Sequence, residues 1–233
     1  MLGRPQGGHV FPVVRPVVRP AVLPASAARE KGFTALEALV VVAILGILLA
    51  VGIPGMRGWL GGTTATGAAE FYAEGFRLAR SQALANNSRS RLVFTENAGS
   101  GQLDWQVDVC FPVPDDGCGA DSARWSTVDE PAPGPEDGNV ETSSVFRSAA
   151  ALPRTTALSV APDSEARSVY FTELGWVDGA KPALMRFDLG PGSADAEHVF
   201  TPTAVVLTLA GAVVTCRPDL VGAAAAGDAR RCP

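Results

Sequence analysis

Residues 31–37 read Lys-Gly-Phe-Thr-Ala-Leu-Glu, and the nineteen residues that follow, 38–56, carry no charge. As a helix that rises about 1.5 Å per residue, the segment 33–56 would extend about 36 Å, against a bilayer hydrocarbon core of about 30 Å. Only Glu37 interrupts the apolar run, and a carboxylate inside a bilayer is costly unless it has a partner or a role. The stretch therefore predicts a membrane helix that begins beside a processing site.

Cleavage after Gly32 would leave a new α-amino group on Phe33, one helical turn from Glu37. Opposite charges attract more strongly in hydrocarbon than in water, so we expect the two groups to pair within one subunit or between subunits offset along a filament. The second arrangement would set the register of assembly. The alternatives are a plain membrane anchor and an ordinary secretory signal. A secretory signal would place its cleavage site after the apolar run, whereas the basic-Gly junction here precedes it.

Gly32, Phe33 and Glu37, with the apolar run behind them, resemble the type III signal of type IV pilins and type II secretion pseudopilins. Pro54 falls where this family usually has a helix-kinking proline. The resemblance implies that a prepilin peptidase cleaves between Gly32 and Phe33 and methylates the Phe33 amine. It also implies an α+β, pilin-like fold, in which a long N-terminal transmembrane helix is followed by an antiparallel β-sheet domain.

The chain is thereby divided into a leader (1–32), a transmembrane and assembly helix (33–57) and a pilin-like domain (58–233). The leader is longer than is common in the family. It holds five of the 19 basic and one of the 24 acidic side chains, so the remaining chain keeps 14 and 23, a net charge of −9. Basic residues before the apolar run predict a single-pass protein whose C-terminal domain lies beyond the membrane, in the periplasm. The resemblance implies that this membrane is the inner membrane and that the protein then joins a pilus or pseudopilus.

Cys110, Cys118, Cys216 and Cys232 all follow the apolar run, in the part that would enter an oxidising compartment. Four cysteines allow three connectivities. We favour Cys110–Cys118 with Cys216–Cys232, because each pair closes a short loop. The rival interpretation is a zinc site, but the chain has no Cys-x-x-Cys pair and only His198 beyond the leader, so we expect neither metal nor cofactor.

Small and aromatic residues recur at three- and four-residue spacing between 65 and 83, which predicts an amphipathic helix that ends near 86–87 and packs on a sheet. Arg77 and Arg80 beside this stripe are expected to be solvated helix charges. From residue 89 onward, short β-branched and aromatic runs separated by turn residues predict an antiparallel sheet. The expected strands are 91–95, 103–110, 144–147, 158–161, 168–172, 184–188, 204–209 and 212–215.

Residues 76–84, Phe-Arg-Leu-Ala-Arg-Ser-Gln-Ala-Leu, resemble the LxxARSEA helix of the GspH/FimT group of minor pseudopilins. Residues 170–175 are similar to that group's strand-then-glycine segment, and residues 205–216 resemble its closing hairpin. The resemblance implies an assembly role at the tip of a type IV pilus or type II secretion pseudopilus, among other minor and major pilins or pseudopilins. The middle of the chain, 96–165, shows no such similarity.

FimT-like members often carry a Gly-Arg-x-Arg hairpin that is linked to DNA capture during natural transformation, whereas residues 211–214 here read Gly-Ala-Val-Val. Arg217, Arg230 and Arg231 could form a small basic tip if a Cys216–Cys232 bridge gathers them. Three charges in an acidic domain give little affinity for phosphates. A DNA-binding minor pilin is therefore an alternative, as are an adhesive pilus-tip subunit and a plain anchored binding domain.

The sequence does not indicate an enzyme. It lacks a Gly-rich phosphate loop, a Gly-x-Ser-x-Gly elbow and a His-Glu-x-x-His helix. Asp115 and Asp116 could contribute to a calcium site, but two carboxylates fall short of the about six to eight oxygens that the ion takes. We expect a polar turn closed by Cys118 instead.

Overall fold

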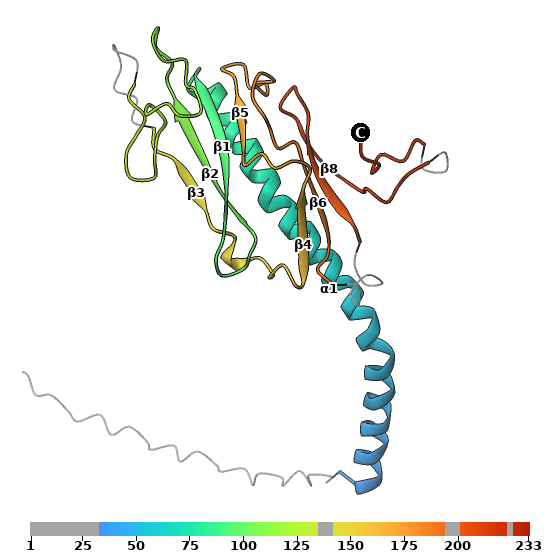
Figure 1. Ribbon diagram of the computed structural model, residues 1–233. Coiled ribbons are helices and arrows are strands. Elements are labelled where there is room, and N and C mark those ends of the chain that lie inside the picture. The colour runs from blue at the N-terminus through green and yellow to red at the C-terminus, as the bar shows by residue number, and fades with distance from the viewer. Residues whose placement is uncertain (1–32, 135–141, 194–200, 223–225) are drawn as a thin grey trace, which may run out of the picture. The chain divides into compact units, whose positions relative to one another are not determined.

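The computed structural model describes residues 33–134, 142–193, 201–222 and 226–233, except for the side chains of 53–61. Gly32, the leader and His198 lie outside the described residues, as does the side chain of Pro54, so the kink at Pro54 stays a prediction. The elements in chain order (Figure 1) are α1 (Ala35–Ala85), β1 (Arg89–Glu96), β2 (Leu103–Cys110), β3 (Val145–Arg147), the short 3-10 helix η1 (Ala149–Ala151), β4 (Leu158–Pro162), β5 (Ser168–Phe171), β6 (Arg186–Pro191), β7 (Thr203–Leu207) and β8 (Val213–Cys216).

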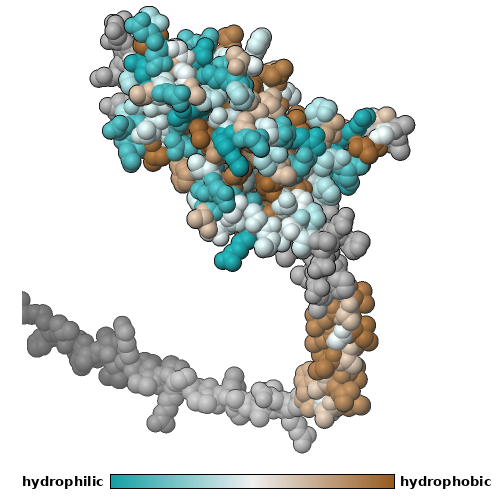
Figure 2. Space-filling view, viewed as in Figure 1, coloured by the Kyte–Doolittle hydropathy of each residue, from teal (hydrophilic) through white to brown (hydrophobic). Residues whose placement is uncertain are grey.

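The first part of α1 is apolar and exposed. The span Ala35–Gly52 has a mean hydropathy of 2.7, and none of it is buried within the protein. Figure 2 shows this part of the helix in the hydrophobic colours on almost every visible atom. By length and composition it can cross a membrane, a property that signal sequences also have. The chain divides into two compact units between Gly46 and Ile47, and the sheets belong to the second.

The described strands form two antiparallel sheets of four strands each, in the orders β3-β2-β1-β5 and β4-β6-β7-β8. The β1–β2 hairpin places Arg89 opposite Cys110, and β5 pairs with the other side of β1, with Ser90 opposite Phe171. In the second sheet β6 lies between β4 and β7, and β8 pairs with β7 as an edge strand. The C-terminal half of α1 runs behind both sheets (Figure 1). The chain is thus an α+β protein with antiparallel pairing throughout its described strands.

All eight predicted strands are present, but they form two sheets where one was expected, and β6 begins at Arg186 rather than at 184. The later start of β6 is explained by the backbone of Leu184. Its N–H donates to the carbonyl of Ser168, at the start of β5 in the first sheet, over 3.3 Å. Residue 184 is therefore tied to one sheet, and the ladder with β7 starts two residues later, where Arg186 faces Val206.

The predicted apolar stripe of the helix is buried and forms the core. Tyr72 lies 4.6 Å from Phe187 of β6 between ring centroids, and Phe76 lies 5.9 Å from Phe94 of β1. Phe94 and Phe187 are themselves in edge contact at 5.1 Å, so the two sheets and the helix share one aromatic cluster. The stripe residues, all at most 1% exposed, are Ala65, Ala68, Ala69, Tyr72, Phe76, Ala79 and Ala83.

The two disulfides join Cys110 to Cys118 and Cys216 to Cys232, the pairing favoured from the sequence. The first is buried in a small cluster with Trp125 and Tyr170, apart from the main core. It ties the end of β2 to the loop that follows, whereas the second ties the end of β8 to the C-terminal segment.

Candidate functional site

The helix that carries the predicted assembly residues begins with a capped turn. The Glu37 N–H donates to Oγ1 of Thr34 over 3.2 Å, and the Ala38 N–H donates to the Thr34 carbonyl over 3.1 Å. Thr34 and Glu37 have the Thr-x-x-Glu spacing of a capping box, a local signal that is present in the sequence. A carboxylate in the first turn also interacts favourably with the helix dipole. Glu37 therefore has a local structural role besides any role in assembly.

Phe33 immediately precedes this turn and is 76% exposed. Glu37 is exposed as well, as is every described residue of the span that can cross a membrane. Phe33 and Glu37 are thus both accessible, within one helical turn of each other in sequence, at the start of α1. An exposed carboxylate on an apolar helix is chemically able to bind a cationic group of another chain.

The three arginines of the predicted basic tip are brought together beside the second disulfide. Arg217 and Arg231 form an isolated backbone bridge, and the Arg217 N–H donates to the Arg230 carbonyl over 2.7 Å. Two of the three guanidinium groups are engaged by carboxylates: Arg217 with Asp219 at 2.5 Å, and Arg230 with Asp228 at 2.8 Å.

The electrostatics of this tip follow from those pairs. The hydrogen bond from Arg230 lowers the pKa of Asp228 to about 2, and the hydrogen bond from Arg217 lowers the pKa of Asp219. Both carboxylates are therefore charged at neutral pH and compensate two of the three cations. Little positive charge is left for phosphate groups, which agrees with the weak DNA affinity expected from the sequence.

The acidic turn before Cys118 is held by its own hydrogen bonds. Asp116 accepts from the Cys118 N–H over 2.9 Å and from the Ser122 hydroxyl over 2.6 Å. The Ser122 hydrogen bond is the main reason that the pKa of Asp116 lies below its usual value. The Asp116 carboxylate therefore forms hydrogen bonds within the turn, as expected for a polar turn closed by Cys118. The described residues contain no group of three or more metal-ligating side chains.

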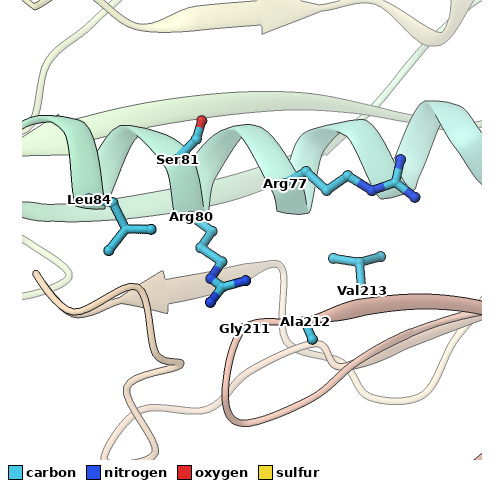
Figure 3. A pocket seen from close by; sticks show the side chains of 7 residues that line it. All are labelled: Arg77, Arg80, Ser81, Leu84, Gly211, Ala212 and Val213. Carbon is cyan, nitrogen blue, oxygen red and sulfur yellow. The ribbon is translucent and has the colours of Figure 1, made fainter.

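A pocket of about 410 Å³ lies where the C-terminal end of α1 meets the β7–β8 turn (Figure 3). Arg80 projects from the helix toward Gly211, between Leu84 on one side and Val213 on the other (Figure 3). Its Nε–H is buried and has no hydrogen-bond partner among the described residues. The residues that line the pocket are Arg77, Arg80, Ser81, Leu84, Gly211, Ala212 and Val213.

The structure corrects the expectation for Arg80. It is not a freely solvated helix charge, because its stem lies beside two tight glycine turns that close over it. A Cβ atom at Gly175 would lie 3.2 Å from Arg80 Cγ, and one at Gly211 would lie 3.0 Å from Arg80 Cδ. Both glycines have positive φ, +71° and +76°, which L residues rarely adopt. Arg77, by contrast, is exposed and paired with Glu70 at 2.8 Å, as expected for a solvated charge.

Three segments that we singled out separately in the sequence, 76–84, 170–175 and 205–216, meet at this pocket. Each contributes one element of the contact: Arg80, Gly175 and Gly211. The glycines after apolar strands were visible in the sequence, but nothing local indicated that their turns converge on one arginine.

Comparison with protein-family models, with curated proteins and with solved structures finds no match to this chain.

Proposed function

We propose that this protein is a minor pilin-like subunit, of the GspH/FimT kind, that assembles into the tip of a type IV pilus or type II secretion pseudopilus. The observation that carries the proposal is the start of the mature chain. A basic-Gly-Phe junction is followed by Glu37 and by an apolar segment whose described residues have no cover within the protein. An apolar helix of this length without cover needs lipid or other helices around it.

In this function, a prepilin peptidase removes residues 1–32 in the inner membrane and methylates the Phe33 amine. The span then packs among the helices of other pilins or pseudopilins, where Glu37 pairs with the Phe33 amine of a neighbouring subunit. The sheets and the C-terminal half of α1 form the periplasmic domain that contacts other subunits. The convergence of segments 76–84, 170–175 and 205–216 supports the proposal, because these segments resemble the GspH/FimT group. The role is structural, without catalysis.

Substitution of Glu37 tests the proposal. Glu37→Ala should leave the chain in the membrane and still cleaved, but lower its recovery in sheared filaments or isolated pseudopili by about tenfold or more, because the pairing charge is lost in a medium of low dielectric. The matched control is Glu70→Ala, which removes an exposed carboxylate paired with Arg77 in the folded domain and should leave recovery unchanged. Normal incorporation of Glu37→Ala would contradict the pairing.

A further inference from the structure

Arg80 differs from several other arginines of the domain in its lack of a carboxylate partner. The guanidinium groups of Arg77, Arg147 and Arg186 each pair with a carboxylate in the folded chain, at 2.8, 3.0 and 2.7 Å. No hydrogen bond or ion pair of the Arg80 guanidinium is found in the part of the chain that the structure describes, and its Nε–H is buried. A buried donor without an acceptor destabilises the folded state, so an acceptor from outside the chain would be bound favourably.

The position of this donor is fixed by its surroundings. The stem of Arg80 lies against Leu84 and the two glycine turns, and a Cβ at Gly211 would come within 2.2 Å of the Gly175 carbonyl oxygen. The turns are therefore in backbone contact beside the arginine, with no room for a side chain at Gly211. A guanidinium held in place loses less conformational freedom when it binds a planar anion than a free arginine does.

Apolar side chains lie in and beside the pocket that Arg80 lines. Leu84, Ala212 and Val213 line the pocket itself, and Leu84 is 50% exposed. Leu174 and Trp176 flank Gly175 in sequence, with exposed fractions of 62% and 58%. Leu209 joins them, since the Val177 N–H donates to its carbonyl over 2.9 Å, and it is 68% exposed. Exposed apolar side chains that surround a charged group are typical of surfaces that bind other proteins.

We propose that this pocket binds an Asp or Glu side chain presented by another protein chain, whose neighbouring apolar residues cover Leu84, Leu174, Trp176 and Leu209. The carboxylate accepts from the Arg80 guanidinium. Apolar side chains lie on both sides of Arg80 (Figure 3), so a segment that continues past the carboxylate contacts both, and a terminal carboxylate would contact only one. The net charge of −9 beyond the leader opposes a nucleic acid here. The inference holds whether or not the leader is cleaved.

The test uses the full chain in detergent micelles with ¹⁵N-labelled arginine, and two capped peptides, acetyl-Leu-Glu-Leu-amide and acetyl-Leu-Gln-Leu-amide. We expect the Glu peptide to shift the assigned Arg80 Nε–H resonance and to bind about tenfold or more tightly than the Gln peptide, because only a carboxylate forms a charge-assisted pair. Arg80→Lys and Leu84→Ser should each weaken binding of the Glu peptide. The matched control is Arg147→Gln, which removes one exposed charge outside the pocket and should change nothing.

Equal affinity for the two peptides, or a shift at other arginines without one at Arg80, would overturn the proposal. Acetate that competes with the Glu peptide at equal concentration would also overturn it, because the site would then bind a small anion without using the apolar surface. The Nε–H resonance is measured in the unsubstituted chain, so the test remains decisive even if a variant at Arg80 fails to fold.

Discussion

At the scale of single residues, the contact between Gly175 and Gly211 is tightly constrained. Gly211 has a φ of +76°, and its amide donates to the Thr208 carbonyl over 2.8 Å, which closes the turn between β7 and β8. A Cβ there would lie 2.2 Å from the Gly175 carbonyl oxygen, a distance at which backbone atoms must move. Only glycine satisfies both the dihedral angle and the space.

Gly211→Ala should therefore lower the free energy of unfolding by about 2–4 kcal/mol, the combined cost of a strained dihedral and overpacking. Gly179→Ala is the control, because Gly179 has ordinary φ and nothing within 4 Å of its Cβ position, and it should change stability by no more than about 0.5 kcal/mol. Denaturant unfolding followed by circular dichroism measures both. Equal stability of the two variants would show that the turns are not packed as described.

At the scale of elements, the C-terminal half of α1 packs against both sheets, and at Gly75 it lies close to the first of them. A Cβ at Gly75 would lie 3.2 Å from Leu92 of β1 and 3.2 Å from Trp105 of β2. Trp105 also donates its Nε1–H to the Phe71 carbonyl over 2.9 Å, so its ring cannot move away without losing a hydrogen bond. At Gly67, earlier in the same helix, no atom lies within 4 Å of the position that a Cβ would take.

These two helical glycines should respond in opposite directions. Gly67→Ala should raise the free energy of unfolding by about 0.5–1 kcal/mol, because alanine favours the helix and no neighbour opposes it. Gly75→Val should lower it by about 1–3 kcal/mol through overpacking against Leu92 and Trp105. Thermal unfolding of the two variants beside the parent chain would check this, and stabilisation by Gly75→Val would contradict the close packing.

Tyr72 links α1 to β2 and predicts the behaviour of the domain in alkali. The pKa of Tyr72 is raised from 10 to about 12, mainly by burial and to a smaller extent by the charge of Asp104. The Leu103 N–H donates to the Tyr72 oxygen, and this hydrogen bond lowers the pKa. Because the pKa is higher in the folded chain, this contribution to stability is complete below about pH 10 and is lost as the pH rises through about 12.

The ultraviolet absorbance of tyrosinate measures this directly. Tyr72 and Tyr170 are the two tyrosines of the chain, so Tyr170→Phe leaves a single signal. We expect that signal to titrate near pH 12, together with loss of the folded circular dichroism spectrum, and a loss of roughly 2–3 kcal/mol of stability over the interval. Titration near pH 10 in a folded chain would mean that Tyr72 is accessible to water.

The helix and the individual strands could be predicted because their signals are local. The Ala, Tyr and Phe positions of 65–83 repeat with the helical period, and all of those named in the stripe are buried. The division into two sheets could not be predicted, since it depends on pairings between strands far apart in the sequence, such as Ser90 with Phe171. The capping pair Thr34 and Glu37 has a local signal as well, the Thr-x-x-Glu spacing, so this cap was predictable from the sequence.

At the scale of the whole molecule, the chain combines an apolar helical span without cover and a folded domain with one aromatic core. The processing signal stays a prediction, because it rests on the sequence alone and Gly32 lies outside the described residues. The pocket around Arg80 was not predictable, because Arg80, Gly175 and Gly211 are joined only by the packing of α1 against two turns that lie far apart in the sequence. Exposed apolar residues lie both on the span and beside the pocket.

The intact mass and N-terminal sequence of the chain recovered from membranes, with and without a prepilin peptidase, test the central proposal most directly. We predict a chain that begins at N-methylated Phe33 when the peptidase is present and keeps residues 1–32 when it is absent. A chain left uncut in the presence of the peptidase, or cut after the apolar span, would contradict the assignment as a filament subunit.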